Sequence, residues 1–166
     1  MPRILEYLNN KKDYRYDSNL YQKAQYAEDG TLTKKGWTDC SHLMYEITGK
    51  IGSITAPYRY EEVDDDLKGR LFDDQGNLRV ELVEGMEVYN KSTGHVGMLL
   101  LYDFGEGLEW AVFQSASTTI KKSKALFQND NDKGPNITSF YQIEPDKKGN
   151  LVTNWYYYTM PRFADE

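Results

Sequence analysis

The sequence predicts an α+β fold, organised as one domain over residues 1–166. Helical spacing of apolar residues is confined to the first third of the chain, strand-like runs follow from residue 86 on, and Gly, Asp and Asn clusters separate those runs. A length of 166 residues fits one domain, and 39% hydrophobic residues with 14 Tyr are enough to bury a core.

Two short helices are expected near the N-terminus, over residues 3–10 and 17–27, where leucine and alanine recur at helical spacing. Residues 28–30 (Glu-Asp-Gly) signal a turn, and residues 31–37 are expected to form a loop.

The clearest helix signal begins at Cys40, where apolar residues recur at positions i, i+3, i+4 and i+7 and form one helical face. Asp39 or Thr38 suits the N-cap, and Gly49 suits the position just past the C-terminus. The apolar face consists of Cys40, Leu43, Met44 and Ile47.

Residues 51–77 are polar and broken by Gly and Pro, which predicts a surface excursion with a turn at residues 73–76. An antiparallel sheet is expected after it, and residues 128–135 are expected to be a mobile loop. The predicted strands are 86–90, 95–102, 109–115, 137–143 and 154–160.

Charge and composition exclude several classes of function. The net charge of -6 disfavours nucleic acid as a partner, and a single cysteine cannot form an intramolecular disulfide. The N-terminus lacks the apolar run of a signal peptide, and no stretch is long and apolar enough for a membrane helix, so a soluble protein without membrane partners is expected. A role outside the cytoplasm then requires a dedicated export machine, lysis or a longer parent chain.

Cys40 is the candidate nucleophile, because the first turn of a helix offers unpaired N–H groups and a positive dipole end that favour a thiolate. The same N–H groups could stabilise an oxyanion. His42 is a poor base for Cys40, because residues at i and i+2 do not face each other on a helix. His95 opens an apolar strand, where a polar ring offers the core little, so it is the candidate general base.

Gln114 is the candidate residue to orient the imidazole. A hairpin turn at residues 103–108 gives facing positions a register sum of roughly 209 to 211. His95 and Gln114 sum to 209, so the two lie opposite each other or one diagonal apart. A register of 210 would place them on opposite faces. Each of the three residues alone more often has a structural role, and their joint arrangement is what favours catalysis.

Four motifs give the chain a resemblance to the NlpC-type cysteine peptidases, which are papain-like enzymes that cut bacterial cell-wall stem peptides. The chain has His42 where the family usually has Gly, Met86 where it usually has Asp, and Gln114 where the third residue is most often His. The motifs are Asp39-Cys40-Ser41, Glu84-Gly85-Met86-Glu87-Val88, Gly94-His95-Val96-Gly97-Met98 and Val112-Phe113-Gln114-Ser115-Ala116-Ser117.

The resemblance implies a papain-like α+β architecture, with N-terminal helices and the nucleophile helix packed on a central antiparallel sheet. It implies that Cys40 attacks an amide of the peptidoglycan stem peptide and that His95 relays the proton. Asp39, Ser41 and, upstream, Tyr26 are the implied substrate or oxyanion contacts. No cofactor or metal is expected, because two histidines without ligand spacing suggest none.

An enzyme of this kind is expected to be delivered to the periplasm or cell wall of a target bacterium, as an effector, toxin domain or phage lysin. A toxin would be expected to have a cognate immunity protein that plugs its cleft. Two alternatives stay open. One is another Cys-His acyl-enzyme, such as a CHAP-type amidase or a transglutaminase-like transferase, and the other is a non-catalytic binding domain in which Cys40 is a core residue.

Overall fold

A six-stranded antiparallel sheet with the strand order β5-β10-β6-β7-β8-β9 dominates the computed structural model, which describes residues 2–16, 22–48, 68–90, 95–116, 122–128 and 133–161. Each neighbouring pair in this order is antiparallel. Its strands are β5 (Lys68–Arg70), β6 (Glu87–Asn90), β7 (Val96–Asp103), β8 (Leu108–Ala116), β9 (Gly134–Ser139) and β10 (Trp155–Thr159).

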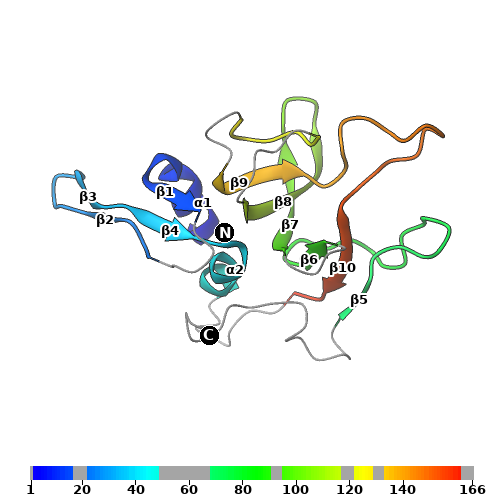
Figure 1. Cartoon of the computed structure of the whole chain (residues 1–166), viewed down its shortest axis with the longest axis horizontal. Helices are drawn as coiled ribbons and strands as arrows, with labels where there is room; N and C mark the ends of the chain where they lie inside the picture. The colour runs from blue at the N-terminus through cyan, green and yellow to red at the C-terminus, as the bar shows by residue number, and fades with distance from the viewer. Residues whose placement is uncertain are drawn as a thin grey trace.

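Two small sheets and three short helical segments complete the described structure. Strand β1 (Tyr14–Tyr16) pairs in parallel with β4 (Gly36–Thr38), and β2 (Gln25–Tyr26) pairs antiparallel with β3 (Leu32–Lys34). Figure 1 shows these sheets and the helices gathered to one side of the large sheet, with β10 and β5 at its other side. The helical segments are α1 (Pro2–Asn9), the 3-10 turn η1 (Lys11–Asp13) and α2 (Cys40–Thr48).

The predicted α+β, papain-like class is wrong, because the described chain is mostly β. The two described α-helices have only 8 and 9 residues, too few for a helical layer that would match the sheet. The expected helix over 17–27 does not form in its described part. There, Gln22 makes an antiparallel bridge to Trp37, with hydrogen bonds of 2.9 and 2.8 Å, so pairing with a distant strand overrides local helical spacing. Residues 17–21 lie outside the described residues.

Three further predictions about loops meet different outcomes. The turn at residues 73–76 is confirmed, because Asp73 N bonds to Asn77 O at 2.9 Å. The expected loop 31–37 instead contributes β3 and β4. Residues 51–67 of the expected excursion lie outside the described residues, and its described part, residues 68–77, contains β5. Residues 129–132 of the expected mobile loop also lie outside the described residues, and β9 begins within that loop, at Gly134.

The hairpin β7–β8 has the register that the turn predicts. Gly97 pairs with Gln114, so the register sum is 211 and Gln114 lies one diagonal from His95. The Asp103 carboxylate stabilises the connecting turn by accepting the N–H groups of Gly105 and Gly107 at 2.6 and 3.1 Å. Both glycines have positive φ, of 126° and 103°, a conformation that other residues rarely adopt.

The two faces of the large sheet bury two separate apolar clusters. One face carries Val96 and Met98 and packs with α2, which lies against β7 and β8. The opposite face carries Leu99 and Val112 and packs with Trp155 of β10. Alternation along β7 therefore decides which side chains meet α2 and which meet β10.

We expect Gly97→Ala to destabilise the fold by about 1–3 kcal/mol through overpacking. A Cβ at this position would collide with a Val112 methyl and lie 3.0 Å from the Phe113 carbonyl oxygen. Urea unfolding of the variant gives the free energy of unfolding. Leu101→Ala is the matched control, because Leu101 lies on the same strand and is 38% exposed; equal unfolding midpoints for the two variants would contradict the close approach at Gly97.

Candidate active site

His95 and Gln114 are in direct contact at the start of β7. The Nε2 atom of His95 and the Oε1 atom of Gln114 form a hydrogen bond. Because an amide oxygen only accepts, Nε2 must carry the proton, and Nδ1 is left as the basic nitrogen of the neutral ring. The diagonal register thus produces the orienting contact predicted between these two residues, while their catalytic role remains a prediction.

Thr138 holds the Gln114 amide in place, a contact that the sequence did not predict. Gln114 Nε2 donates to Thr138 Oγ1 at 2.6 Å, and both side chains are buried. With its nitrogen bonded to Thr138, the amide presents its oxygen to His95. Thr138 lies within a predicted strand, but nothing in the sequence indicated that this strand would be the neighbour of β8.

Trp155 covers one face of the His95 ring. The two rings stack with centroids 5.5 Å apart and an interplanar angle of 26°. Burial lowers the pKa of His95 below its ordinary value of about 6.5, and the hydrogen bond to Gln114 opposes this shift only in part. The imidazole is therefore neutral at pH 7 and able to accept a proton.

Cys40 is the first residue of α2 and is 7% exposed. Asp39 occupies the N-cap position, because its carbonyl oxygen accepts the N–H of Leu43 at 3.3 Å. Two residues before the cysteine, Thr38 Oγ1 bonds to Ser115 Oγ at 2.7 Å. This bond holds the segment that leads to Cys40 against the residue next to Gln114.

The thiol and the imidazole belong to opposite faces of the sheet. Cys40 lies in the apolar cluster with Val96, whereas the His95 ring stacks on Trp155 in the other cluster. His95 precedes the first residue of β7, so it lies at the end of this strand. For the thiol and the imidazole to meet, one of the two side chains therefore has to reach past this end of the strand to the other face of the sheet.

The remaining predicted site residues have other surroundings. Asp39 is buried, and the side chains of Ser41 and His42, both in α2, lie outside the described residues. The Tyr26 hydroxyl donates to Asp13 Oδ2 at 2.7 Å, and burial together with this bond raises its pKa. Its expected oxyanion role remains a prediction.

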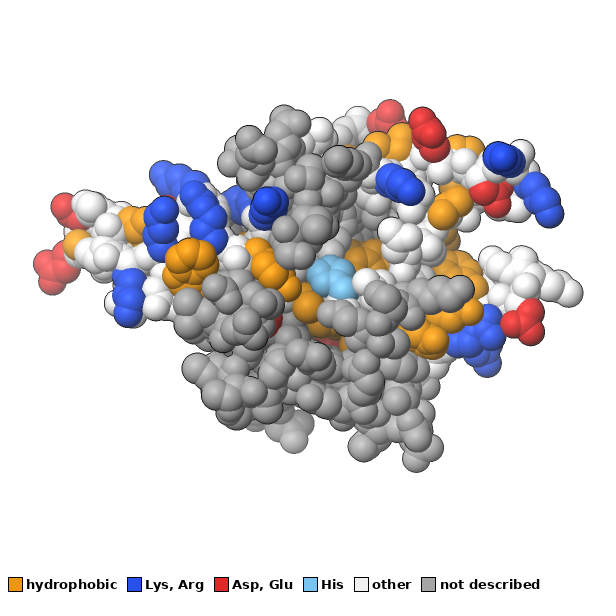
Figure 2. Space-filling view, in the orientation of Figure 1, with side chains coloured by type: hydrophobic (Ala, Val, Ile, Leu, Met, Phe, Trp, Pro, Cys, Tyr) orange, Lys and Arg blue, Asp and Glu red, His pale blue; other side chains and the backbone are white. Residues whose placement is uncertain are grey.

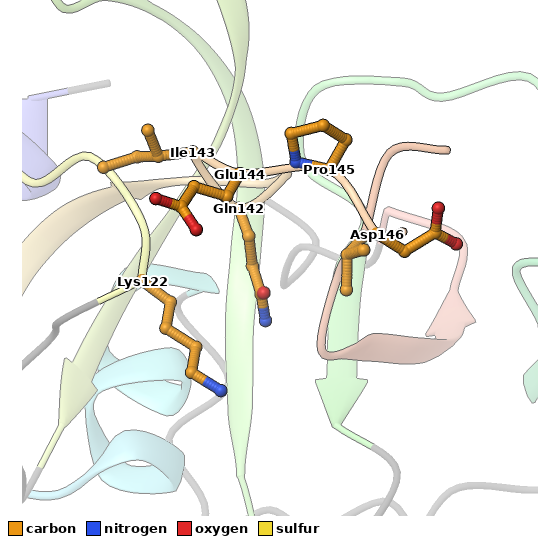
Figure 3. A pocket seen from close by; sticks show the side chains of 7 residues that line it. Lys122, Gln142, Ile143, Glu144, Pro145 and Asp146 are labelled. Atoms are coloured by element: carbon orange, nitrogen blue, oxygen red, sulfur yellow. The ribbon is translucent and has the colours of Figure 1, made fainter. Parts of the chain in front are cut away.

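Two pockets in the described part of the chain lie away from Cys40 and His95. The first has a volume of about 420 Å³ and is shown in Figure 3, where Lys122 lies below the Gln142–Asp146 segment. The second has a volume of about 630 Å³, and four of its seven lining residues are Lys or Arg.

Neither a metal site nor a membrane span is found in the described ranges. Their His, Cys, Asp and Glu side chains form no group of three or more that could hold a metal ion. Their helices are all too short or too polar to cross a lipid bilayer.

Comparison with known proteins gives no relative from which a role could be transferred: no family model, no curated protein and no solved structure matches this chain.

Acidification should destabilise the protein through His95. The unfolded chain binds a proton near pH 6.5 and the folded chain only at lower pH, so the stabilising contribution is complete above 6.5 and is lost as pH falls toward the folded pKa. Melting temperatures measured from pH 7.5 to 5 should fall less steeply in His95→Gln. An unchanged slope in His95→Gln would contradict the depressed pKa.

Proposed function

We propose that the protein is a cysteine hydrolase that cleaves amide bonds, with Cys40 as nucleophile and His95 as general base. The observation that carries this proposal is the chain of contacts from His95 through Gln114 to Thr138. A partly buried, neutral imidazole whose tautomer is fixed by a second residue is the arrangement that a general base needs.

The chemistry would proceed through an acyl-enzyme. His95 takes the thiol proton of Cys40, and the sulfur attacks the carbonyl carbon of the scissile amide. Backbone N–H groups in the first turn of α2 stabilise the oxyanion. The proton on His95 then passes to the leaving amine as the C–N bond breaks, and a water activated by His95 hydrolyses the thioester and regenerates the thiol. All of these groups come from the protein, so the proposed reaction needs no cofactor.

The proposed substrate is the stem peptide of peptidoglycan. Support for this substrate comes from the sequence motifs around Cys40, His95 and Gln114, which resemble those of NlpC-type peptidases. Delivery to a target cell wall and inhibition by a cognate immunity protein are proposals that rest on the same resemblance.

A non-catalytic binding domain is the second candidate, and one observation favours it. Cys40 is buried in an apolar cluster on the face of the sheet opposite the His95 ring. A small buried thiol of this kind is often only a core residue. The two candidates differ in the reactivity that they predict for the sulfur.

If Cys40 is the nucleophile, iodoacetamide should alkylate it in the folded protein with a pH midpoint well below 8, because the α2 N-terminus stabilises the thiolate and transfer of the thiol proton to His95 would pair the thiolate with an imidazolium. The rate is measured by mass spectrometry from pH 5 to 9. His95→Ala should move the midpoint toward about 8.5, and the control His42→Ala should not. Alkylation only after unfolding would identify Cys40 as a core residue.

Digestion of purified peptidoglycan tests the substrate. The wild type should release fragments with a new amine and a new carboxylate, and in ¹⁸O-labelled water the carboxylate should gain one label, which separates hydrolysis from acyl transfer. Cys40→Ala and His95→Ala should both reduce cleavage to background, because the two groups act as a unit. Their melting temperatures identify any loss that is due to misfolding. Retained cleavage in a folded Cys40→Ala protein would end the proposal.

A further inference from the structure

A pocket of about 630 Å³ beside α1 concentrates positive charge in an acidic protein. Its lining includes Lys11, Lys12, Arg15 and Lys133, together with the ring of Phe127 and the last turn of α1. The whole chain carries a net charge of -6, so this clustering runs against its composition. In Figure 2, Lys and Arg side chains gather over the α1–β1 part of this face of the molecule. We call this site the basic pocket.

Lys11 has a structural role in the basic pocket. It is 7% exposed, and its ammonium donates to the carbonyl oxygen of Lys133 and lies 5.7 Å from the centroid of the Phe127 ring. These contacts connect η1 to the residue that precedes β9. Lys11 therefore holds the two walls of the pocket together, and the exposed cations supply the charge available to a ligand.

The three exposed cations are Lys12, Arg15 and Lys133, and in the described part of the chain none of them forms a salt bridge. Arg15 Nη1 is held by two backbone carbonyls, those of Lys12 and Tyr14, each at 3.0 Å. This leaves the rest of the guanidinium fork to face a ligand while its position is fixed.

The nearby described carboxylates do not neutralise these cations. Glu6 pairs with Lys23 at 2.9 Å, and Asp13 is buried and accepts the Tyr26 hydroxyl. The C-terminal end of α1 contributes only about half a negative charge by its dipole, against the three full positive charges of the exposed side chains. Among the described residues, the basic pocket therefore has an excess of positive charge, whose field a concave low-dielectric wall focuses.

We propose that the basic pocket binds a small anion that carries two or more carboxylate or phosphate groups. Its volume lies in the range of small-molecule sites, roughly 300–1,000 Å³. Lysine ammonium groups and an arginine fork are the donors that recognise such oxygens. This proposal does not depend on the chemistry of Cys40 and goes beyond the hydrolase function.

Isothermal titration calorimetry with citrate and with inorganic pyrophosphate, at low ionic strength, tests the proposal on the full chain. One or both probes should bind, and the tighter of the two identifies carboxylate or phosphate as the preferred group. Lys12→Glu combined with Arg15→Glu should weaken binding by about 10-fold or more, because both attractive charges become repulsive. Raising the salt concentration should weaken wild-type binding.

A double charge reversal at Lys147 and Lys148 is the matched control. Both lysines are exposed, and their replacement by Glu changes the net charge by the same amount. This control should bind within about 2-fold of the wild type. If the first variant is unstable, the double variant Lys12→Gln and Lys133→Gln replaces it in the test. This variant leaves the Arg15 contacts intact and should also weaken binding. Failure of both probes to bind, or equal weakening in the control, would overturn the proposal.

Discussion

The pairing of Gly97 with Gln114 is the constraint on which the arrangement around His95 depends. This register places Gln114 one diagonal from His95, at a separation that a glutamine side chain can span. Because Gly97 has no side chain, a Val112 methyl and the Cβ of Gln114 can lie close to its Cα. A one-residue slip would turn Gln114 to the other face and leave the imidazole without its partner.

Burial and hydrogen bonding then act on His95 in opposite directions, and burial is the larger effect. Stacking on Trp155 removes water from one face of the ring, which disfavours the imidazolium, while the Gln114 amide oxygen favours it. The outcome is a neutral ring with a defined tautomer. Thr138 contributes indirectly, because its hydrogen bond to Gln114 Nε2 holds the amide beside the ring.

Sequence patterns predicted the parts of this structure that are set locally. The turn with two glycines after Asp103 sets the β7–β8 register at 211, one of the sums that residue counting allowed, so the contact between His95 and Gln114 could be predicted except for the open register of 210. The stacking of Trp155 could not, because it depends on how β10 inserts between β5 and β6. The face of the sheet on which α2 packs could not be predicted either, since odd-numbered and even-numbered residues in the first half of β7 are both buried and apolar.

The error in fold class has a related physical cause. Alanine and leucine at helical spacing favoured a helix over 17–27, but the hydrogen bonds between Gln22 and Trp37 commit the described part to strand pairing. The polar segment that contains β3 and β4 lacks the alternation that reveals a half-buried strand, and β1 pairs with β4 in parallel across a long stretch of sequence. Propensity is a weak prior wherever such non-local partners exist.

The basic pocket and the His95 site lie toward the same end of the β8–β9 pair, so the salt concentration decides how strongly a bound anion acts on the imidazole. Gln114 pairs with Asn136, three residues along the chain from Lys133, or about 10 Å in an extended strand. The distance across β8 to His95 adds further separation. The Debye length is about 10 Å at 0.1 M salt and about 30 Å at 0.01 M, so an anion near Lys133 would be partly screened from the imidazole at the higher salt concentration and much less at the lower one. An anion bound at low salt should therefore raise the pKa of His95, and this effect should fade as salt is added.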